Sequence, residues 1–174
     1  MRPGAPVAVV TGGASGIGAA CCRELAKRAW SVVVADIDEA AAARLAGEVG
    51  GAAYRVDVGD DASIENLAQR VEAEAGPVDA LVNSAGVIQV PLPPEDLPLQ
   101  AWDNVVRIDQ RGTYLASVAF GCRMARRGRG AIVNIASIAA MRSMPLHAYA
   151  PAKAAVLAMT ECLAAEWGRS GVRV

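Results

Sequence analysis

Histidine, aromatic residues and metal-ligand patterns are scarce in this chain of 174 residues. It has one histidine, and aromatic residues make up only 4% of the sequence. The four cysteines are Cys21, Cys22, Cys122 and Cys162; one pair is adjacent, and no pair has the spacing of zinc ligands. We therefore expect no metal site, and we expect the cysteines to be buried, reduced thiols.

The chain also lacks an excess of charge of either sign and lacks long hydrophobic runs. Its net charge of −1 gives no reason to expect nucleic acid or an anionic membrane as a partner. No apolar stretch reaches the roughly 18 residues that a membrane span requires. The opening segment, MRPGAPVAVV, has no long apolar region of the kind found in signal peptides, so we expect a cytoplasmic protein.

Positive charge gathers at one place, where Arg123, Arg126, Arg127 and Arg129 lie within seven residues. Cations at the C-terminal end of a helix interact favourably with the helix dipole, which is one interpretation of this cluster. A binding site for an anion is the alternative.

Short β-branched runs alternate with longer helical patterns in a chain that is 53% hydrophobic. The runs predict strands at 7–11, 31–36, 52–57, 79–84, 131–137 and from 172, and helices at 16–29, 39–48, 61–75, 100–127 and 149–168. Residues 86–98 contain four prolines and are expected to form a loop. Strands that are apolar on both faces and separated by helices indicate a doubly wound parallel sheet, an α/β fold, in a single domain spanning residues 1–174. Ligands of such sheets bind beyond the carboxyl ends of the strands.

A glycine-rich segment, TGGASGIG at 11–18, follows the first expected strand and opens the first helix. Glycine permits a tight turn and a close approach of the backbone to a pyrophosphate, and the helix start offers free N–H groups. Gly12, Gly16 and Gly18 in this context predict a nucleotide site, although a plain glycine-rich turn is the alternative.

Asp36 ends the second expected strand, 18 residues after Gly18. A carboxylate near this spacing accepts hydrogen bonds from the adenosine ribose and repels a 2′-phosphate. We therefore expect NAD rather than NADP, while an ordinary solvated acid at a strand end remains the other interpretation.

The segment YAPAK places Tyr149 and Lys153 one helical turn apart, so that both side chains share a face. A free phenol has a pKa of about 10, and a neighbouring ammonium makes it more acidic. Pro151 falls in the first helical turn, where its missing N–H is no loss. Taken alone, the pair would usually be an exposed tyrosine and lysine at a helix start.

These motifs together resemble the short-chain dehydrogenase/reductase family, over essentially all 174 residues. TGGASGIG is similar to the cofactor loop of the family, which implies that Gly12, Ser15, Gly16, Ile17 and Gly18 contact the cofactor. Asp57 and Val58 resemble its adenine contact, and NSAG at 83–86 is similar to its Asn-Asn-Ala-Gly segment, with Ser84 in place of the second asparagine. The resemblance implies that Asn83, Ala85 and Gly86 line the cofactor site.

The resemblance also implies a reaction, in which a hydride passes between NAD(H) and a secondary alcohol or ketone. Tyr149 would be the general acid or base, Lys153 would acidify it and bind the nicotinamide ribose, and Ser137 would hold the substrate oxygen. Dimers and tetramers are common in the family, which implies a homo-oligomer paired through the helices expected at 100–127 and 149–168.

Two features depart from the family pattern. Asp109 stands where the family commonly has an asparagine, and its carboxylate would offset the charge that acidifies Tyr149, so we expect slower turnover at neutral pH. The chain also stops where relatives continue into a complete sixth strand, a substrate lid and a seventh strand. A catalytically silent nucleotide-binding or scaffold module is therefore the alternative to an active enzyme.

Overall fold

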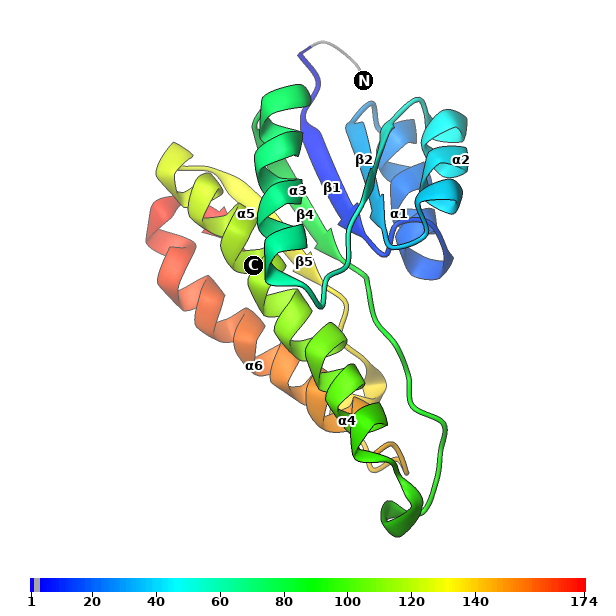
Figure 1. The fold of residues 1–174 in the computed structure, drawn as a ribbon. Helices are drawn as coiled ribbons and strands as arrows, with labels where there is room; N and C mark the ends of the chain where they lie inside the picture. Colours follow the sequence, from blue (N-terminus) through cyan, green and yellow to red (C-terminus); the bar gives the residue numbers. More distant parts are fainter. Residues whose placement is uncertain (2–3) are drawn as a thin grey trace.

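Six parallel strands form one sheet in the order β3-β2-β1-β4-β5-β6 (Figure 1). In this computed structural model, which describes residue 1 and residues 4–174, the strands are β1 (Val7–Thr11), β2 (Ser31–Asp36), β3 (Ala52–Arg55), β4 (Val78–Asn83), β5 (Gly130–Asn134) and β6 (Val172–Arg173). The strand order reverses between β1 and β4, which makes this point the expected position of a ligand site. The doubly wound α/β fold predicted from the sequence is confirmed.

Helices cover both faces of the sheet (Figure 1). On one face lie α1 (Gly16–Lys27) and α2 (Glu39–Val49), and on the other lie α3 (Asp61–Glu74), α5 (Thr113–Arg127) and α6 (Tyr149–Trp167). The remaining short elements are α4 (Leu99–Val105), η1 (Pro94–Asp96), η3 (Ile138–Ala140) and η4 (Gly168–Ser170). Within the part of the chain that the structure describes, no helix has the length and apolarity to cross a bilayer.

The core follows from strands that are apolar on both faces. Val9 and Val33 point into the larger hydrophobic cluster, with Phe120 of α5 and Trp167 of α6. Their neighbours along the strands, including Val10, point into a second cluster with α1 and α2. Successive side chains of a strand alternate between faces, so each valine run fills both layers.

The helix predicted over 100–127 is continuous but not uniform. Between α4 and α5 the chain forms a π-helical segment, η2 (Val106–Gly112). A Cβ atom on Gly112 would lie 2.6 Å from the Val58 carbonyl oxygen, so only glycine lets this segment lie so close to the end of β3. Such π segments are frequent at functional sites, and this one contains Asp109.

Two strands are shorter than predicted, and the difference lies at their carboxyl ends. β3 stops at Arg55 because Asp57 begins a turn in which its carboxylate accepts the Gly59 N–H at 2.8 Å. β5 stops at Asn134, before the short turn η3 begins at Ile138. Asp57 and Val58 after β3, and Ser137 after β5, therefore lie in loops rather than in strands.

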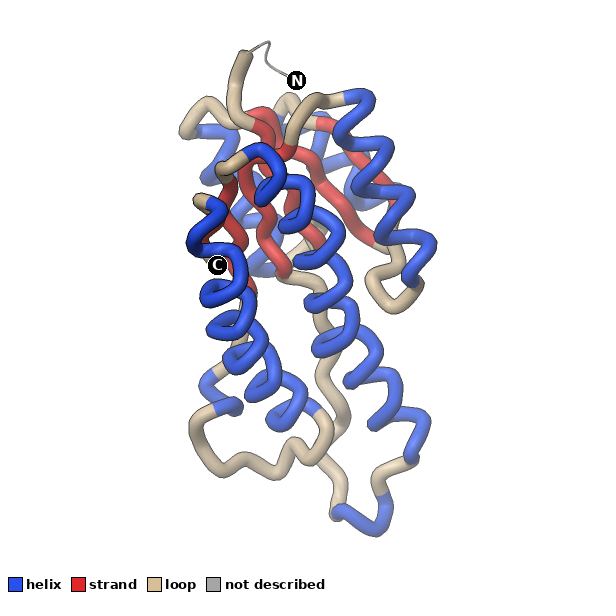
Figure 2. Tube along the Cα trace, turned by 90° about the vertical axis from the view of Figure 1, so that its left-hand side faces the viewer, coloured by secondary structure: helices blue, strands red, loops and turns tan. Residues whose placement is uncertain are grey.

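Figure 2 shows the α4–α5 stretch and α6 continuing well past the strands, so that both project beyond the carboxyl edge of the sheet. A small cluster of Val105, Ala148 and Ala152 joins α4 to α6 in this projecting region. The start of α6, with Tyr149 and Lys153, is thereby placed beside the edge where ligands bind.

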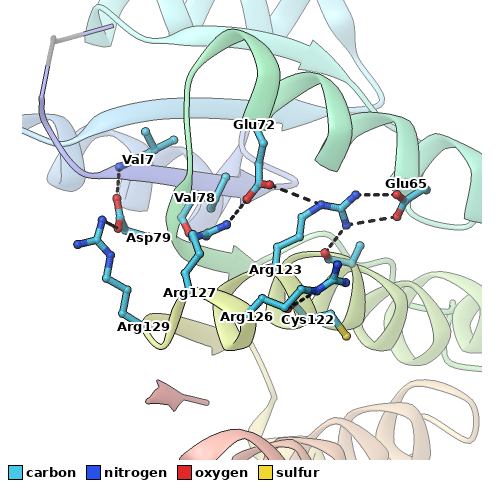
Figure 3. A network of polar contacts seen from close by, with 11 residues as sticks. Val7, Glu65, Glu72, Val78, Asp79, Cys122, Arg123, Arg126, Arg127 and Arg129 are labelled. Atoms are coloured by element: carbon cyan, nitrogen blue, oxygen red, sulfur yellow. Dashed lines mark hydrogen bonds and ion pairs between the residues drawn. The ribbon is translucent and has the colours of Figure 1, made fainter. Parts of the chain in front are cut away.

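The arginine cluster pairs with acidic groups of the chain itself (Figure 3). Arg123 lies 2.6 Å from Glu65, Arg127 lies 2.6 Å from Glu72, and Arg129 lies 3.3 Å from Asp79. Arg126 donates to the Cys122 carbonyl oxygen of its own helix. These contacts clamp α5 to α3 and the start of β4, which favours a structural role over an anion site.

Candidate active site

A cleft of about 470 Å³ opens at the carboxyl ends of β1, β2 and β4. Its lining comprises Gly12, Ser15, Gly16, Ile17, Asp36, Ile37, Val56, Asp57, Val58, Ser84, Ala85, Gly86, Val87, Ile88, Ile108, Asp109, Ile135, Tyr149 and Lys153. Segments from seven separate parts of the sequence therefore meet where the strand order reverses.

The loop after β1 has the backbone that the glycine pattern predicts. Gly12 and Gly16 have φ angles of +61° and +51°, a region that residues with a side chain rarely adopt. A Cβ atom on Gly12 would stand 2.6 Å from the Ala85 Cα, so this glycine also permits the contact with the segment after β4. Ser15 begins α1 as its N-cap, but its exposed hydroxyl makes no capping bond and is free for a ligand.

Asp36 lies under this loop at the end of β2. One carboxylate oxygen accepts the Ala14 N–H at 2.9 Å and the other accepts the Asp38 N–H at 3.1 Å. A carboxylate has about four acceptor positions, so two remain for hydroxyl groups of a ligand. Beside it, Ile37 is 58% exposed and offers an apolar surface.

Asp57 has a cationic neighbour that the sequence pattern did not indicate. Arg107 of the π segment lies 3.4 Å from the Asp57 carboxylate and covers Gly59. The contact joins the end of β3 to η2. It also partly neutralises an acidic side chain of the cleft, in a position where the pair is half exposed and weakly stabilising.

Tyr149 and Lys153 share the face of α6 that borders the cleft. The Lys153 ammonium lies 5.6 Å from the centre of the Tyr149 ring and is almost completely buried. It donates a hydrogen bond of 3.0 Å to the Ile135 carbonyl oxygen, just beyond β5. A buried cation is thus fixed beside a phenol.

Asp109 is the second charged group at this lysine. Its side chain is fully buried, with Oδ1 accepting the Val87 N–H at 2.8 Å and Oδ2 lying 3.3 Å from the Lys153 Nζ. Burial raises the pKa of the Asp109 carboxyl above its ordinary value, while the Val87 N–H and the Lys153 ammonium act in the opposite direction. The carboxylate lies close enough to offset part of the lysine charge.

Three residues that the resemblance assigned to the site lie outside the lining of this cleft: Gly18, Asn83 and Ser137. Gly18 packs against the Gly12 carbonyl oxygen and lets α1 approach the sheet. The Asn83 amide is buried and donates to Ser117 at 2.9 Å and to Asn134 at 2.8 Å, so it joins the end of β4 to α5 and to β5. The Ser137 oxygen accepts the Ala139 N–H at 3.2 Å, which leaves its hydroxyl hydrogen available.

Sequence reasoning missed several residues of the cleft. Ile37 directly follows β2 and Ile135 directly follows β5. Because ligands bind beyond the carboxyl ends of the strands, these positions could have indicated the Ile37 side chain and the Ile135 carbonyl group as parts of the site. Ile88 and Ile108 come from a proline-rich loop and a π segment, where no periodic pattern indicates which side chains face the site.

The chain matches the family model described as short chain dehydrogenase over residues 6–174. It is 44% identical to D-threitol dehydrogenase of Mycolicibacterium smegmatis, with 97% of this chain and 66% of that protein covered. Galactitol 2-dehydrogenase of Rhizobium johnstonii is 39% identical, with 96% of this chain and 68% of that protein covered.

A similar solved structure is described as ribose-5-phosphate isomerase from Brucella melitensis 16M. It is 56% identical, has a TM-score of 0.96, and is matched over 98% of this chain and 66% of its own. The chain thus spans about two thirds of the length of these relatives. Since the family model covers all but the first five residues, the chain belongs to the short chain dehydrogenase family.

Proposed function

We propose that this chain binds NAD(H) and catalyses hydride transfer between that cofactor and a secondary alcohol or ketone, with Tyr149 as the general acid or base. We also infer that residues 1–174 form a single dinucleotide-binding and catalytic domain. The observation that carries the proposal is the buried Lys153 ammonium held beside the Tyr149 ring at the border of the cleft.

The residues of the cleft fit a dinucleotide. No atom lies within 4 Å of the place where a Cβ atom on Gly16 would stand, so a pyrophosphate can approach the backbone at the start of α1. The free Ser15 hydroxyl lies in the same loop. Asp36 offers its remaining acceptor positions to the adenosine ribose, and the exposed Ile37 next to it, with Val58, suits the flat adenine ring.

NAD is favoured over NADP by the charge at the end of β2. The Asp36 carboxylate would repel a 2′-phosphate, and the neighbouring exposed side chain is Ile37 rather than a cation. The proposed preference therefore depends on one carboxylate that is already fixed by two backbone N–H groups.

In the proposed reaction, the Tyr149 oxygen takes the hydroxyl proton of the alcohol and returns it in the reverse direction. The Lys153 charge stabilises the phenolate that this role requires, because a free phenol is mostly neutral at pH 7. Ser137 donates its free hydroxyl hydrogen to the substrate oxygen. When bound, the nicotinamide accepts the hydride from the alcohol carbon.

A polyol is the substrate class that we propose. Two of the relatives are named for D-threitol and galactitol, which are both polyols. Because one similar solved structure is described as a ribose-5-phosphate isomerase, ribose 5-phosphate should be assayed beside the polyols. If the protein isomerised ribose 5-phosphate with no change in NADH concentration, the proposal would be contradicted.

We further propose that the protein is a homo-oligomer, either a dimer or a tetramer. Ala116 and Ala119 of α5 are buried within their own chain, whereas Ala154 and Ala158 of α6 are exposed. Small exposed residues on a largely apolar helix permit close packing against a second copy.

The proposal is tested by fluorescence titration with NADH and NADPH, followed by turnover assays on a panel of polyols. We expect NADH to bind at least about tenfold more tightly than NADPH, a preference that Asp36→Asn narrows because it removes the charge but keeps the acceptor. Asp96→Asn, at the exposed last residue of η1, is the matched control. Binding of NADH without turnover of any substrate would support the silent-module alternative.

A further inference from the structure

Gln89 has an unexpected environment in the loop that follows β4. Its side chain is only 4% exposed, whereas its two neighbours, Ile88 and Val90, are 63% and 71% exposed. A loop that turns two aliphatic residues outward and one amide inward runs against the usual preference of these residue types. Burial of an amide is costly unless its polar atoms find partners. Among the described residues the Gln89 side-chain oxygen has partners, whereas its Nε2 has none.

The partners of this oxygen are the first residues of α6. The Gln89 side-chain oxygen accepts the N–H of Ala148 and, at 3.1 Å, the N–H of Tyr149. The two segments are 60 residues apart in the sequence. One amide oxygen thus joins the loop after β4 to the residue proposed as general acid or base.

The N–H groups at the start of α6 show why this oxygen is needed. The first N–H groups of a helix have no partner within the helix, and a capping side chain usually supplies one. Here Ala148 is the N-cap and has no side chain able to cap. Ala150 donates to the Leu146 carbonyl oxygen, and Pro151 has no N–H, so Ala148 and Tyr149 are the two groups that Gln89 satisfies.

The same loop is fixed at a second point, two residues earlier. The Val87 N–H donates to Asp109, which in turn contacts Lys153. The loop is therefore bound to the lysine side of the pair through Asp109 and to the tyrosine side through Gln89. Ile88, between these two points, lines the cleft.

We propose that Gln89 is a positioning residue for Tyr149: its side-chain oxygen caps α6 and couples the backbone of the tyrosine to the loop that borders the cleft. The inference rests on the proposed dehydrogenase function for its catalytic meaning. The contact itself can be tested without turnover.

The test compares three variants of the full chain. Gln89→Leu has similar size but no acceptor, Gln89→Glu keeps an acceptor at the same reach, and Gln69→Leu makes the same change on the exposed face of α3. Amide hydrogen exchange of Ala148 and Tyr149 is measured by NMR. We expect exchange at these two amides to become about fivefold faster or more in Gln89→Leu, as for loss of a helix cap, and to stay near the wild-type rate in Gln89→Glu and Gln69→Leu.

Turnover with NAD and a polyol gives the second readout. We expect kcat to fall by about tenfold in Gln89→Leu with the KM for NAD little changed, because small displacements of a catalytic group slow the reaction. If Gln89→Leu does not fold, Gln89→Asn, whose amide is one methylene shorter, replaces it.

Unchanged exchange at Ala148 and Tyr149 in Gln89→Leu would overturn the inference. So would an unchanged kcat in Gln89→Leu, because loss of the acceptor must then leave Tyr149 in place. Wild-type protein without turnover on any polyol would instead contradict the proposed function, and the exchange rates would still decide whether Gln89 caps α6.

Discussion

Asp109 is the residue with the greatest expected influence on the Tyr149–Lys153 pair. Its buried carboxylate lies 3.3 Å from the lysine and has one further partner, the Val87 N–H. A negative charge this close weakens the positive potential that the lysine exerts on the phenol. We therefore expect the pair to be influenced by a residue that lies 40 positions before Tyr149 in the sequence.

We predict that Asp109→Asn moves the acidic limb of the pH dependence of kcat/KM to lower pH, by about one pH unit, and raises turnover at neutral pH. The amide keeps the acceptor for the Val87 N–H but removes the charge beside Lys153. Asp103→Asn, at an exposed position of the preceding helix α4, should leave the profile unchanged. An identical pH–rate profile in wild type and Asp109→Asn would refute this account.

The same carboxylate predicts a pH dependence of stability. Because burial raises the pKa of Asp109 in the folded state, the folded protein favours the protonated form. The stabilising contribution is therefore complete below the ordinary carboxyl pKa of about 3.9 and is lost as the pH rises through the raised value. Asp109→Asn has no such loss.

We therefore expect the free energy of unfolding of Asp109→Asn, relative to wild type, to increase as the pH rises across this window. Urea unfolding at a series of pH values measures the difference. A difference that stays constant, or that decreases with rising pH, would show that the carboxyl is not held in an unfavourable environment.

For the four cysteines, the sequence correctly predicted free thiols but not how deeply each one is buried. All four thiols are free, but only Cys22 is fully buried, and Cys162 is exposed. Burial raises the pKa of Cys22 to about 12, which suits an unreactive core residue. The expectation that all four are buried was wrong for Cys162, because α6 turns that position toward its exposed side, and it holds only in part for Cys21 and Cys122, which are partly buried.

At the scale of elements, the helices differ in how closely they pack. A Cβ atom on Gly121 would overlap the ring of Trp167, so α5 and α6 approach each other at a position where only glycine fits. By contrast, nothing lies within 4 Å of the place where a Cβ atom on Gly47 of α2 would stand. Replacement of these two helical glycines by alanine should therefore have opposite effects on stability.

We predict that Gly121→Ala lowers the free energy of unfolding by about 1 to 3 kcal/mol, as overpacking of a filled core does. Gly47→Ala should raise it by up to about 1 kcal/mol, because alanine has the higher helix propensity. Urea denaturation of both variants measures the two changes. Equal effects in the same direction would show that the contact between α5 and Trp167 is loose.

The elements themselves were largely predictable, since β-branched runs and helical periodicity are local properties. The π segment was not, because inserting a wider turn into a long helical pattern leaves the apolar spacing almost unchanged on either side. Tyr149 and Lys153 were predictable because their spacing is one turn of a single helix. Gln89 and Arg107 were not, since each contacts a partner about 50 or 60 residues away.

At the scale of the whole molecule, the sheet order brings the separate segments of the cleft together. The glycine loop follows β1, Asp36 ends β2, and the segment with Gln89 follows β4. The projecting halves of the α4–α5 stretch and α6 then bring Asp109, Tyr149 and Lys153 to the same edge (Figure 2). The ion pairs between the arginines of α5 and the acids of α3 hold these two helices together on one face of the sheet (Figure 3).

The most direct test of the account is the rate of NADH formation from a polyol, measured for wild type and Tyr149→Phe at matched cofactor occupancy. The account predicts that removing the single phenolic oxygen lowers kcat by at least about a hundredfold, while the affinity for NADH stays within about twofold of wild type. A Tyr149→Phe variant that turns over at the wild-type rate would contradict the assignment of this residue as the general acid or base.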